Sequence, residues 1–160
     1  MLKYLNTQVV FQEIPNEITL AINITGCKHH CEGCHSPELR KNIGVKLNCS
    51  TLDSLIDSNE GITCVCFMGG DHELGSLANL IWHVKDVRNL KVALYTGSET
   101  IPMNWCEKLD YLKLGEYKKD LGGLRSSITN QRFYAITHST NYYLEDITNT
   151  FYANNKENIQ

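Results

Sequence analysis

Short strand-like segments that alternate with helix-like connections are the feature that most constrains the fold of this 160-residue chain. Alternation of this kind is typical of βαβ units, which place their strands in a mainly parallel sheet. Five or so such strands are too few to close an eight-stranded barrel. An incomplete barrel or an open sheet remains, and we predict an α/β fold built as an incomplete (partial) β/α barrel with a mainly parallel sheet. The expected strands are residues 9–14, 17–25, 63–68, 91–96, 110–114 and 132–138.

Turn and capping signals separate these segments. Pro15-Asn16 predicts a turn between the first two strands, and the second strand alternates apolar and polar residues. A short helix is expected to begin at Pro37, because proline suits the first helical position. Ser50 or Thr51 is expected to cap the next helix. Two further helical segments are expected at residues 74–84 and 104–109.

Composition and charge exclude several classes of protein. The formal net charge is −3, and no run of Lys or Arg is longer than a pair, so the sequence indicates no nucleic-acid partner. The apolar runs are far too short to cross a bilayer, and the N-terminus lacks the pattern of a signal peptide. We therefore expect no membrane partner and a cytoplasmic location. We also expect one domain, residues 1–140, followed by a polar C-terminal tail, residues 141–160.

Three of the seven cysteines, Cys27, Cys31 and Cys34, fall within eight residues directly after the second expected strand. In a reducing cytosol such clustering indicates metal or redox chemistry rather than a disulfide framework. The loop can wrap around one metal centre, and Gly26 and Gly33 permit the backbone angles that wrapping needs. Three thiolates leave a cubane iron–sulfur cluster one iron short of full protein ligation. A small molecule could coordinate that open iron.

The cysteine spacing is also compatible with a structural zinc site. His29, His30 or His35 would then supply the fourth ligand of a Cys₃His set. Spacing alone leaves both kinds of site open, although zinc sites more often pair two Cys-x-x-Cys knuckles and the chain has no second one. The remaining cysteines are expected to be core or ordinary small hydrophobic residues: Cys49, Cys64, Cys66 and Cys106.

With Cys-x-x-x-Cys-x-x-Cys in place, the chain resembles the radical S-adenosylmethionine superfamily. Within it, the chain is most similar to the activating protein of anaerobic (class III) ribonucleoside-triphosphate reductase, over about residues 9–138. The stretches that carry the resemblance are Ile24-Thr25-Gly26-Cys27, Gly33-Cys34-His35-Ser36-Pro37, Phe67-Met68-Gly69-Gly70-Asp71, Leu94-Tyr95-Thr96-Gly97, Leu121-Gly122-Gly123-Leu124 and Thr129-Asn130-Gln131-Arg132. Many superfamily members have an aromatic residue where this chain has Gly33, and the activating-protein subgroup is similar to this chain there.

The resemblance implies a role for each residue of the cysteine motif. Cys27, Cys31 and Cys34 would ligate three irons of a [4Fe–4S] cluster. The methionyl amino and carboxylate groups of S-adenosylmethionine would chelate the fourth iron. Gly33 and His35, which flank Cys34, would lie against the adenosine end of that cofactor.

Gly69, Gly70 and Asp71 follow the third expected strand, and the resemblance gives them a cofactor-binding role as well. The glycines would expose backbone groups to the methionyl ammonium, and Asp71 would accept a hydrogen bond from it. Physical chemistry agrees, because paired glycines let backbone approach a ligand and a carboxylate favours a neighbouring ammonium. The residues alone also fit a strand-to-helix turn with Asp71 as the N-cap. Both roles can hold at once.

As a whole, the resemblance implies an activating enzyme, an oxidoreductase that cleaves S-adenosylmethionine reductively. Its product would be a glycyl radical on the anaerobic ribonucleoside-triphosphate reductase, and a small electron-donor protein such as flavodoxin or ferredoxin would reduce the cluster. No catalytic side chain beyond the cluster ligands is expected, because the cofactor carries the hard chemistry. Two alternatives stay open. One is a different radical S-adenosylmethionine enzyme that acts on a small molecule, and the other is a zinc-binding module without catalysis.

Overall fold

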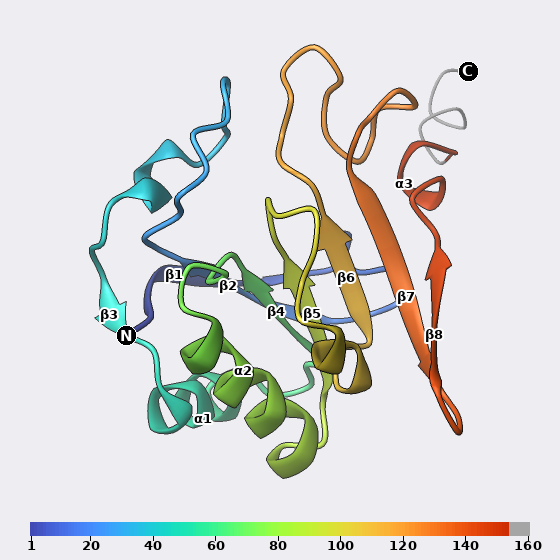
Figure 1. The fold of residues 1–160 in the computed structure, drawn as a ribbon. Coiled ribbons are helices and arrows are strands. Elements are labelled where there is room, and N and C mark those ends of the chain that lie inside the picture. Colours follow the sequence, from blue (N-terminus) through green and yellow to red (C-terminus); the bar gives the residue numbers. More distant parts are fainter. Residues whose placement is uncertain (154–160) are drawn as a thin grey trace.

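One eight-stranded sheet forms the centre of the protein in a computed structural model that describes residues 1–153 (Figure 1). The strands lie in the order β3-β1-β2-β4-β5-β6-β7-β8. Their bounds are β1 (Lys3–Val10), β2 (Thr19–Ile24), β3 (Val45–Lys46), β4 (Cys64–Met68), β5 (Lys91–Tyr95), β6 (Tyr111–Leu114), β7 (Arg132–His138) and β8 (Tyr142–Asp146). The α-helices are α1 (Cys49–Asp57), α2 (Leu74–Trp82) and α3 (Thr150–Ala153). The short helical turns are η1 (Pro37–Arg40), η2 (His83–Val87) and η3 (Met103–Glu107).

The pairing of the strands confirms the α/β class and corrects the predicted sheet. Strands β2, β4, β5 and β6 pair in parallel, as expected for βαβ units. The pairs β1–β2, β1–β3, β6–β7 and β7–β8 are antiparallel, so the prediction of a mainly parallel sheet is wrong. For β7 and β8 the reason is the length of the connection, since a short link such as residues 139–141 can join only antiparallel neighbours. Within residues 1–153 the edge strands β3 and β8 do not pair with each other, and the predicted incomplete barrel is not confirmed.

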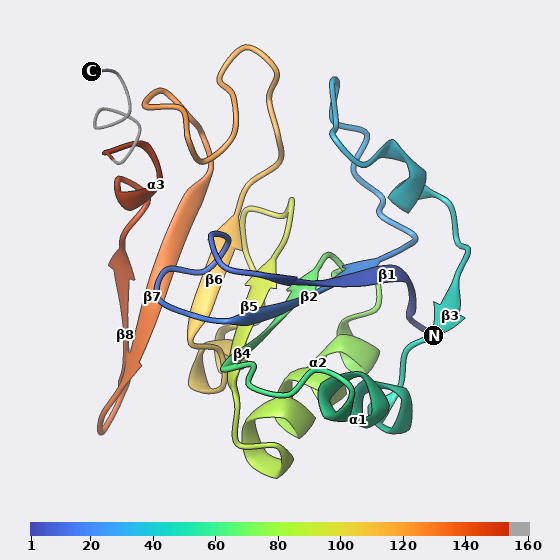
Figure 2. The ribbon, with the colours of Figure 1, turned by 180° about the vertical axis from the view of Figure 1, so that it is seen from behind.

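The turn at Pro15-Asn16 is confirmed. The amide of Glu17 donates to the carbonyl of Ile14 at 3.2 Å, and Asn16 has a φ of 64°. Asparagine tolerates this left-handed conformation better than most residues. The first strand spans Lys3–Val10 and not the expected residues 9–14, because the residues before the turn form a loop. This loop reaches across the sheet to β7, as Figure 2 shows.

Apolar side chains cover both faces of the central strands. Alternate residues of a strand point to opposite faces, so Val65 and Phe67 lie in one cluster and Cys64 and Cys66 lie in the other. Helices α1 and α2 pack against the face that carries Phe67 (Figure 1). The smaller cluster, around Cys66, is covered by the loop between β1 and β2 and by the segment after β8. The expectation that Cys64 and Cys66 are core residues is confirmed, since both are fully buried.

The helix starts agree with the sequence signals in one place and differ in another. Pro37 occupies the start of η1, as expected. Helix α1 begins slightly earlier than the predicted caps, because Asn48 is its N-cap. The Oδ1 atom of Asn48 accepts from the backbone amide of Thr51 at 2.9 Å. Thr51 is therefore the capped residue rather than the cap.

Replacing Asn48 with alanine removes the only side-chain oxygen that caps α1 within the described residues. We expect Asn48→Ala to lower the free energy of unfolding by about 1 kcal/mol, the usual cost of losing such a cap. Urea denaturation followed by circular dichroism measures this difference. Ser50→Ala is the matched control, since the Ser50 side chain is exposed and should change stability little. A larger effect of Ser50→Ala than of Asn48→Ala would contradict the assignment of the cap.

The segment that was expected to be a polar tail, residues 141–160, contributes to the sheet at its beginning. Residues Tyr142–Asp146 form β8, which pairs with β7, and Phe151 packs on Phe133 with ring centroids 4.8 Å apart. The pattern of β8 is weak because its outer face is polar or exposed. The last part of the expected tail, residues 154–160, lies outside the described residues. Among residues 1–153, no helix has the length and apolar character needed to span a membrane.

Candidate functional site

The three clustered cysteines lie on the loop of residues 26–35, which we call the cysteine loop. It follows β2, at the edge where the parallel strands β2, β4, β5 and β6 end (Figure 1). The amide of Cys27 donates to the carbonyl of Leu39 at 3.0 Å, and the Arg40 guanidinium donates to the carbonyl of Cys31 at 2.7 Å. The cysteine loop is therefore fixed by the turn η1 that follows it.

Two glycines let the cysteine loop take this path. Gly26 has a φ of 83° and Gly33 a φ of 71°, which is the left-handed region that side chains rarely adopt. Gly26 also packs closely on His72, because a Cβ atom there would lie 2.9 Å from the imidazole Nε2. The sequence prediction that these glycines permit the wrapping of the loop agrees with this geometry.

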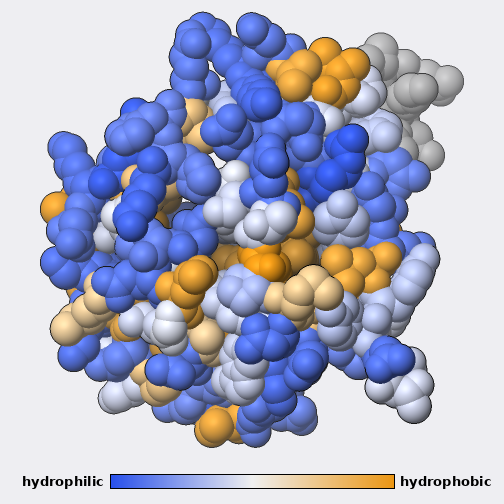
Figure 3. Space-filling model, in the orientation of Figure 1, coloured by the Kyte–Doolittle hydropathy of each residue, from blue (hydrophilic) through white to orange (hydrophobic). Residues whose placement is uncertain are grey.

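Cys27, Cys31 and Cys34 all line one cavity of about 240 Å³, which we call the cysteine cavity. All three thiols are free and half-buried. Other lining residues come from the ends of the parallel strands and the turns after them, and include Met68, Gly69, Tyr95, Thr96, Gly97 and Lys113. Figure 3 shows hydrophobic residues near the middle of this face of the molecule, surrounded by hydrophilic ones. The cavity thus combines three thiols with a partly apolar wall.

The donor set fits an iron–sulfur cluster. Among residues 1–153, no three His, Cys, Asp or Glu side chains converge on the position of a single metal ion. A cubane cluster does not require that convergence, because it distributes its thiolate ligands over separate iron atoms. Burial raises the pKa of the Cys27 thiol, and the neighbouring Asp71, Cys31 and Cys34 raise it further. A bound metal centre would offset this cost, because ligation deprotonates the thiol.

Asp71 lies beside the cysteine cavity and is already hydrogen-bonded. Its Oδ2 atom accepts from Thr96 Oγ1, from Ser98 Oγ at 2.8 Å and from His29 Nε2 at 3.2 Å. Burial alone would raise the pKa of Asp71, but these hydrogen bonds and the charge of His29 hold that pKa below its ordinary value. Asp71 therefore joins the cysteine loop, through His29, to the turn after β5.

Asp71 is not the N-cap that the residues alone suggested. Helix α2 begins after Glu73, whose side chain makes no capping hydrogen bond. Asp71 stands two residues earlier, and its carboxylate faces the turn after β5 instead of the helix amides. A polar role at the site, rather than helix capping, explains its position.

The two predicted glycines after β4 have different surroundings. Gly69 lines the cysteine cavity, and its φ of 96° requires glycine. Gly70 is buried, and a Cβ atom there would lie 3.0 Å from Ile24 and 3.4 Å from Leu77. Gly70 therefore packs on the core, and its predicted contact with the cofactor stays a prediction.

His35 and Gly33 lie at the outer side of the cysteine loop. His35 lines a second cavity, of about 480 Å³, which we call the adjoining cavity. Its ring packs on Tyr117 with centroids 5.1 Å apart. Gly33 is exposed, next to the side chains of Tyr117 and Lys119. The two cavities share lining residues: Cys34, Ser36, Tyr95, Lys113, Tyr117 and Gln131.

Lys113 is the site residue that the sequence reasoning missed. It lies on β6, lines both cavities and is only 8% exposed. Its Nζ atom donates to the carbonyl of Gly115 at 2.5 Å and to that of Thr96 at 3.4 Å. Burial lowers the pKa of Lys113 to about 8, although Cys31 and Asp71 act in the opposite direction. The sequence feature that could have indicated Lys113 is its position as a single charged residue within the apolar strand Tyr111–Leu114.

Because the pKa of Lys113 is lowered, the free energy of unfolding should depend on pH differently in wild type and in Lys113→Met. Between pH 8 and the ordinary lysine value of 10.5, the unfolded state binds more protons at this residue than the folded state. Stability contributed at this residue therefore rises with pH. In cluster-free protein we expect wild type to gain about 2 to 3 kcal/mol relative to Lys113→Met across this range. Urea denaturation at several pH values measures the difference, and parallel pH profiles would contradict it.

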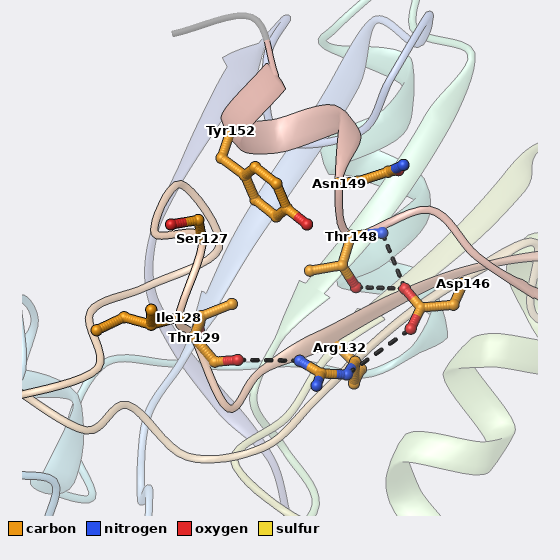
Figure 4. Close-up of a pocket in the computed structure, with 8 residues that line it drawn as sticks. All are labelled: Ser127, Ile128, Thr129, Arg132, Asp146, Thr148, Asn149 and Tyr152. Carbon is orange, nitrogen blue, oxygen red and sulfur yellow. Dashed lines mark hydrogen bonds and ion pairs between the residues drawn. The ribbon is translucent and has the colours of Figure 1, made fainter. Parts of the chain in front are cut away.

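A third cavity, of about 520 Å³, lies near the C-terminal segment and contains no residue of the cysteine loop. Figure 4 shows that Arg132, Asp146 and Thr148 are paired with one another in this cavity. Arg132 donates to the carbonyl of Thr129 at 2.9 Å and pairs with Asp146 at 3.7 Å. Thr148 donates to the same carboxylate at 2.5 Å. We therefore assign the chemistry to the cysteine cavity and not to this one.

The other four cysteines lie away from the cysteine cavity. Cys64, Cys66 and Cys106 are buried, and Cys49 is half-buried on α1. Burial raises the pKa of both the Cys64 and the Cys66 thiol far above the ordinary value. A thiol that stays protonated is a poor metal ligand, because the thiolate is the ligating form. Cys64 and Cys66 are therefore packing residues.

The comparison with protein families identifies the class of the chain. The family described as the 4Fe-4S single cluster domain matches residues 18–137, a range that includes the whole cysteine loop and all the lining residues of the cysteine cavity. Because the match spans most of the chain, the chain belongs to this family. It is thus an iron–sulfur protein, and a [4Fe–4S] cluster is the cofactor that the family supports in preference to zinc. No curated protein and no solved structure matches the chain.

Proposed function

We propose that this protein is a radical S-adenosylmethionine activating enzyme that generates a glycyl radical on anaerobic ribonucleoside-triphosphate reductase. The observation that carries the proposal is the meeting of Cys27, Cys31 and Cys34 in one cavity at the carboxyl edge of the parallel strands. Ligands of α/β folds bind at this edge. Family membership supports the cluster, and the three-cysteine motif supports an open coordination position on it.

When bound and reduced by an external donor such as a flavodoxin or a ferredoxin, the [4Fe–4S] cluster supplies the electron that breaks a carbon–sulfur bond of S-adenosylmethionine. The chain itself would bind and orient the cluster and S-adenosylmethionine and exclude water from them. Cys27, Cys31 and Cys34 would hold three irons, and the bare backbone of Gly69 leaves room for a ligand beside them. Met68 and other apolar lining residues limit the access of water to this side of the cavity.

The adjoining cavity supports the proposal that the substrate is part of another protein. It shares lining residues with the cysteine cavity and opens beside His35 and Tyr117, next to the loop of residues 115–131. A glycine-bearing loop of a partner would have to come close to the bound S-adenosylmethionine for a hydrogen atom of that glycine to be removed. No residue of this chain needs to act as an acid or a base in that step.

Anaerobic reconstitution with iron and sulfide tests the first half of the proposal. After dithionite and S-adenosylmethionine are added, we expect a bound [4Fe–4S] cluster and the formation of 5′-deoxyadenosine. Tightly bound zinc without acid-labile sulfide would contradict the proposal and indicate a zinc-binding module. Wild-type protein purified without oxygen and analysed for both metals provides the comparison.

Mixing with the anaerobic reductase tests the second half. We expect an electron paramagnetic resonance doublet from a glycyl radical on the reductase, and its loss when S-adenosylmethionine is left out. Cleavage of S-adenosylmethionine without this doublet, in the presence of the active reductase, would contradict the partner. It would then favour a radical S-adenosylmethionine enzyme that acts on a small molecule.

A further inference from the structure

Lys113 is a buried cation that faces the cysteine cavity. Strand β6 places it in a lining that also contains Cys31 and Cys34. Its ammonium is held by two backbone carbonyls, those of Thr96 and Gly115, at the ends of β5 and β6. These neutral acceptors fix the position of the charge without neutralising it.

No carboxylate pairs with Lys113 in residues 1–153. The lysines that do form ion pairs there are Lys85, Lys91, Lys108 and Lys119. All four are more exposed than Lys113, with side-chain exposures from 27% to 64%. Burying a charge without an opposite charge is costly, so the position of Lys113 calls for an anion in the cavity.

The cysteine cavity provides that anion when it holds its cluster. Three thiolates outweigh the charge of a [4Fe–4S] core, and one-electron reduction adds a further negative charge without uptake of a proton. A fixed positive charge in a low-dielectric site favours the more negative state. Net charge and hydrogen bonding around a cluster are among the factors that set its reduction potential.

We propose that the positive charge of Lys113, fixed in the lining of the cysteine cavity, raises the reduction potential of the [4Fe–4S] cluster by stabilising its reduced state. The inference rests on the three-cysteine cluster of the proposed function and does not depend on S-adenosylmethionine cleavage. It concerns the electron that an external low-potential donor delivers to the cluster. Without the ammonium of Lys113, the cluster would accept that electron less readily.

Lys113→Gln is the decisive variant, because glutamine keeps a hydrogen-bond donor for the two carbonyls and removes the charge. We expect the midpoint potential of the cluster, in reconstituted protein without S-adenosylmethionine, to shift to a more negative value. Redox titration with low-potential mediators, followed by electron paramagnetic resonance of the reduced cluster, measures this shift. Lys113→Arg keeps the charge and should restore a potential close to that of wild type.

Lys119→Gln is the matched control, since it removes the same charge from a side chain that is 64% exposed and lies near Gly33. Solvent and salt screen a charge in that position, so the midpoint potential of the cluster should shift far less in Lys119→Gln than in Lys113→Gln. Lys113→Met, which also fills the stem of the side chain, replaces Lys113→Gln if that variant does not take up iron. A potential that is the same in wild type and in the neutral Lys113 variants would overturn the inference. Failure of wild type to bind a cluster would instead overturn the proposed function, so the two failures are distinguishable.

Discussion

Cys31→Ala should leave the protein unable to hold a [4Fe–4S] cluster after anaerobic reconstitution. Cys31 lies in the middle of the motif, and only two thiols, those of Cys27 and Cys34, would remain on the cysteine loop. Two thiolates leave two iron atoms without protein ligands where the wild-type protein leaves one, and a cluster so held is lost readily. We expect iron and acid-labile sulfide to fall to background and 5′-deoxyadenosine formation to disappear. Metal analysis, visible absorbance and product assay measure the three effects.

Cys49→Ala provides the matched control for this prediction. Cys49 is also a free, half-buried thiol, but it lies on α1 and does not line the cysteine cavity. This variant should retain its cluster and its activity. A normal cluster content in Cys31→Ala, or an equal loss of the cluster in Cys49→Ala, would show that the cysteine loop is not the ligand set. Circular dichroism of both variants separates loss of ligation from loss of folding.

The cysteine loop was predictable from the sequence because its information is local. Cys27, Cys31 and Cys34 lie within one short stretch of chain, and the glycines that shape the loop are its own residues. The central parallel strands were predictable for a similar reason, since each is a short segment with an apolar or alternating pattern. Strand β7 has the bounds that were expected, residues 132–138.

The rest depended on contacts between distant parts of the chain. Antiparallel pairing at the sheet edges follows from how β3 and β8 meet their neighbours, and neither segment has a strong strand pattern. The hydrogen bonds of Asp71 come from residues 25 to 42 positions away, so the sequence around Asp71 gives no sign of them. Lys113 could be noticed as a charge in an apolar strand, but only tertiary structure places it beside Cys31.

Phe133→Ala should destabilise the protein far more than loss of the α1 cap does, because Phe133 holds together the smaller core cluster. Phe133 is fully buried on β7, and its ring contacts those of Phe151, Tyr95 and Tyr111, with centroids 4.8, 5.8 and 6.1 Å away. Replacing a buried phenylalanine with alanine costs about 3–5 kcal/mol through lost burial and the cavity left behind. For a chain of this length that corresponds to a fall in Tm of about 6–20 °C. Thermal unfolding followed by circular dichroism measures it.

The same substitution should weaken the site, because two of the rings that Phe133 supports line cavities. Tyr95 lines both the cysteine cavity and the adjoining cavity, and Phe151 lines the adjoining cavity. Tyr143→Ala is the matched control, since Tyr143 is an aromatic residue of β8 that is 68% exposed. Its effect should stay within about 0.5 kcal/mol, as for most surface substitutions. If Phe133→Ala were as stable as Tyr143→Ala, the segment after β8 would not be docked on β7 through this ring, and the wall of the adjoining cavity would need another support.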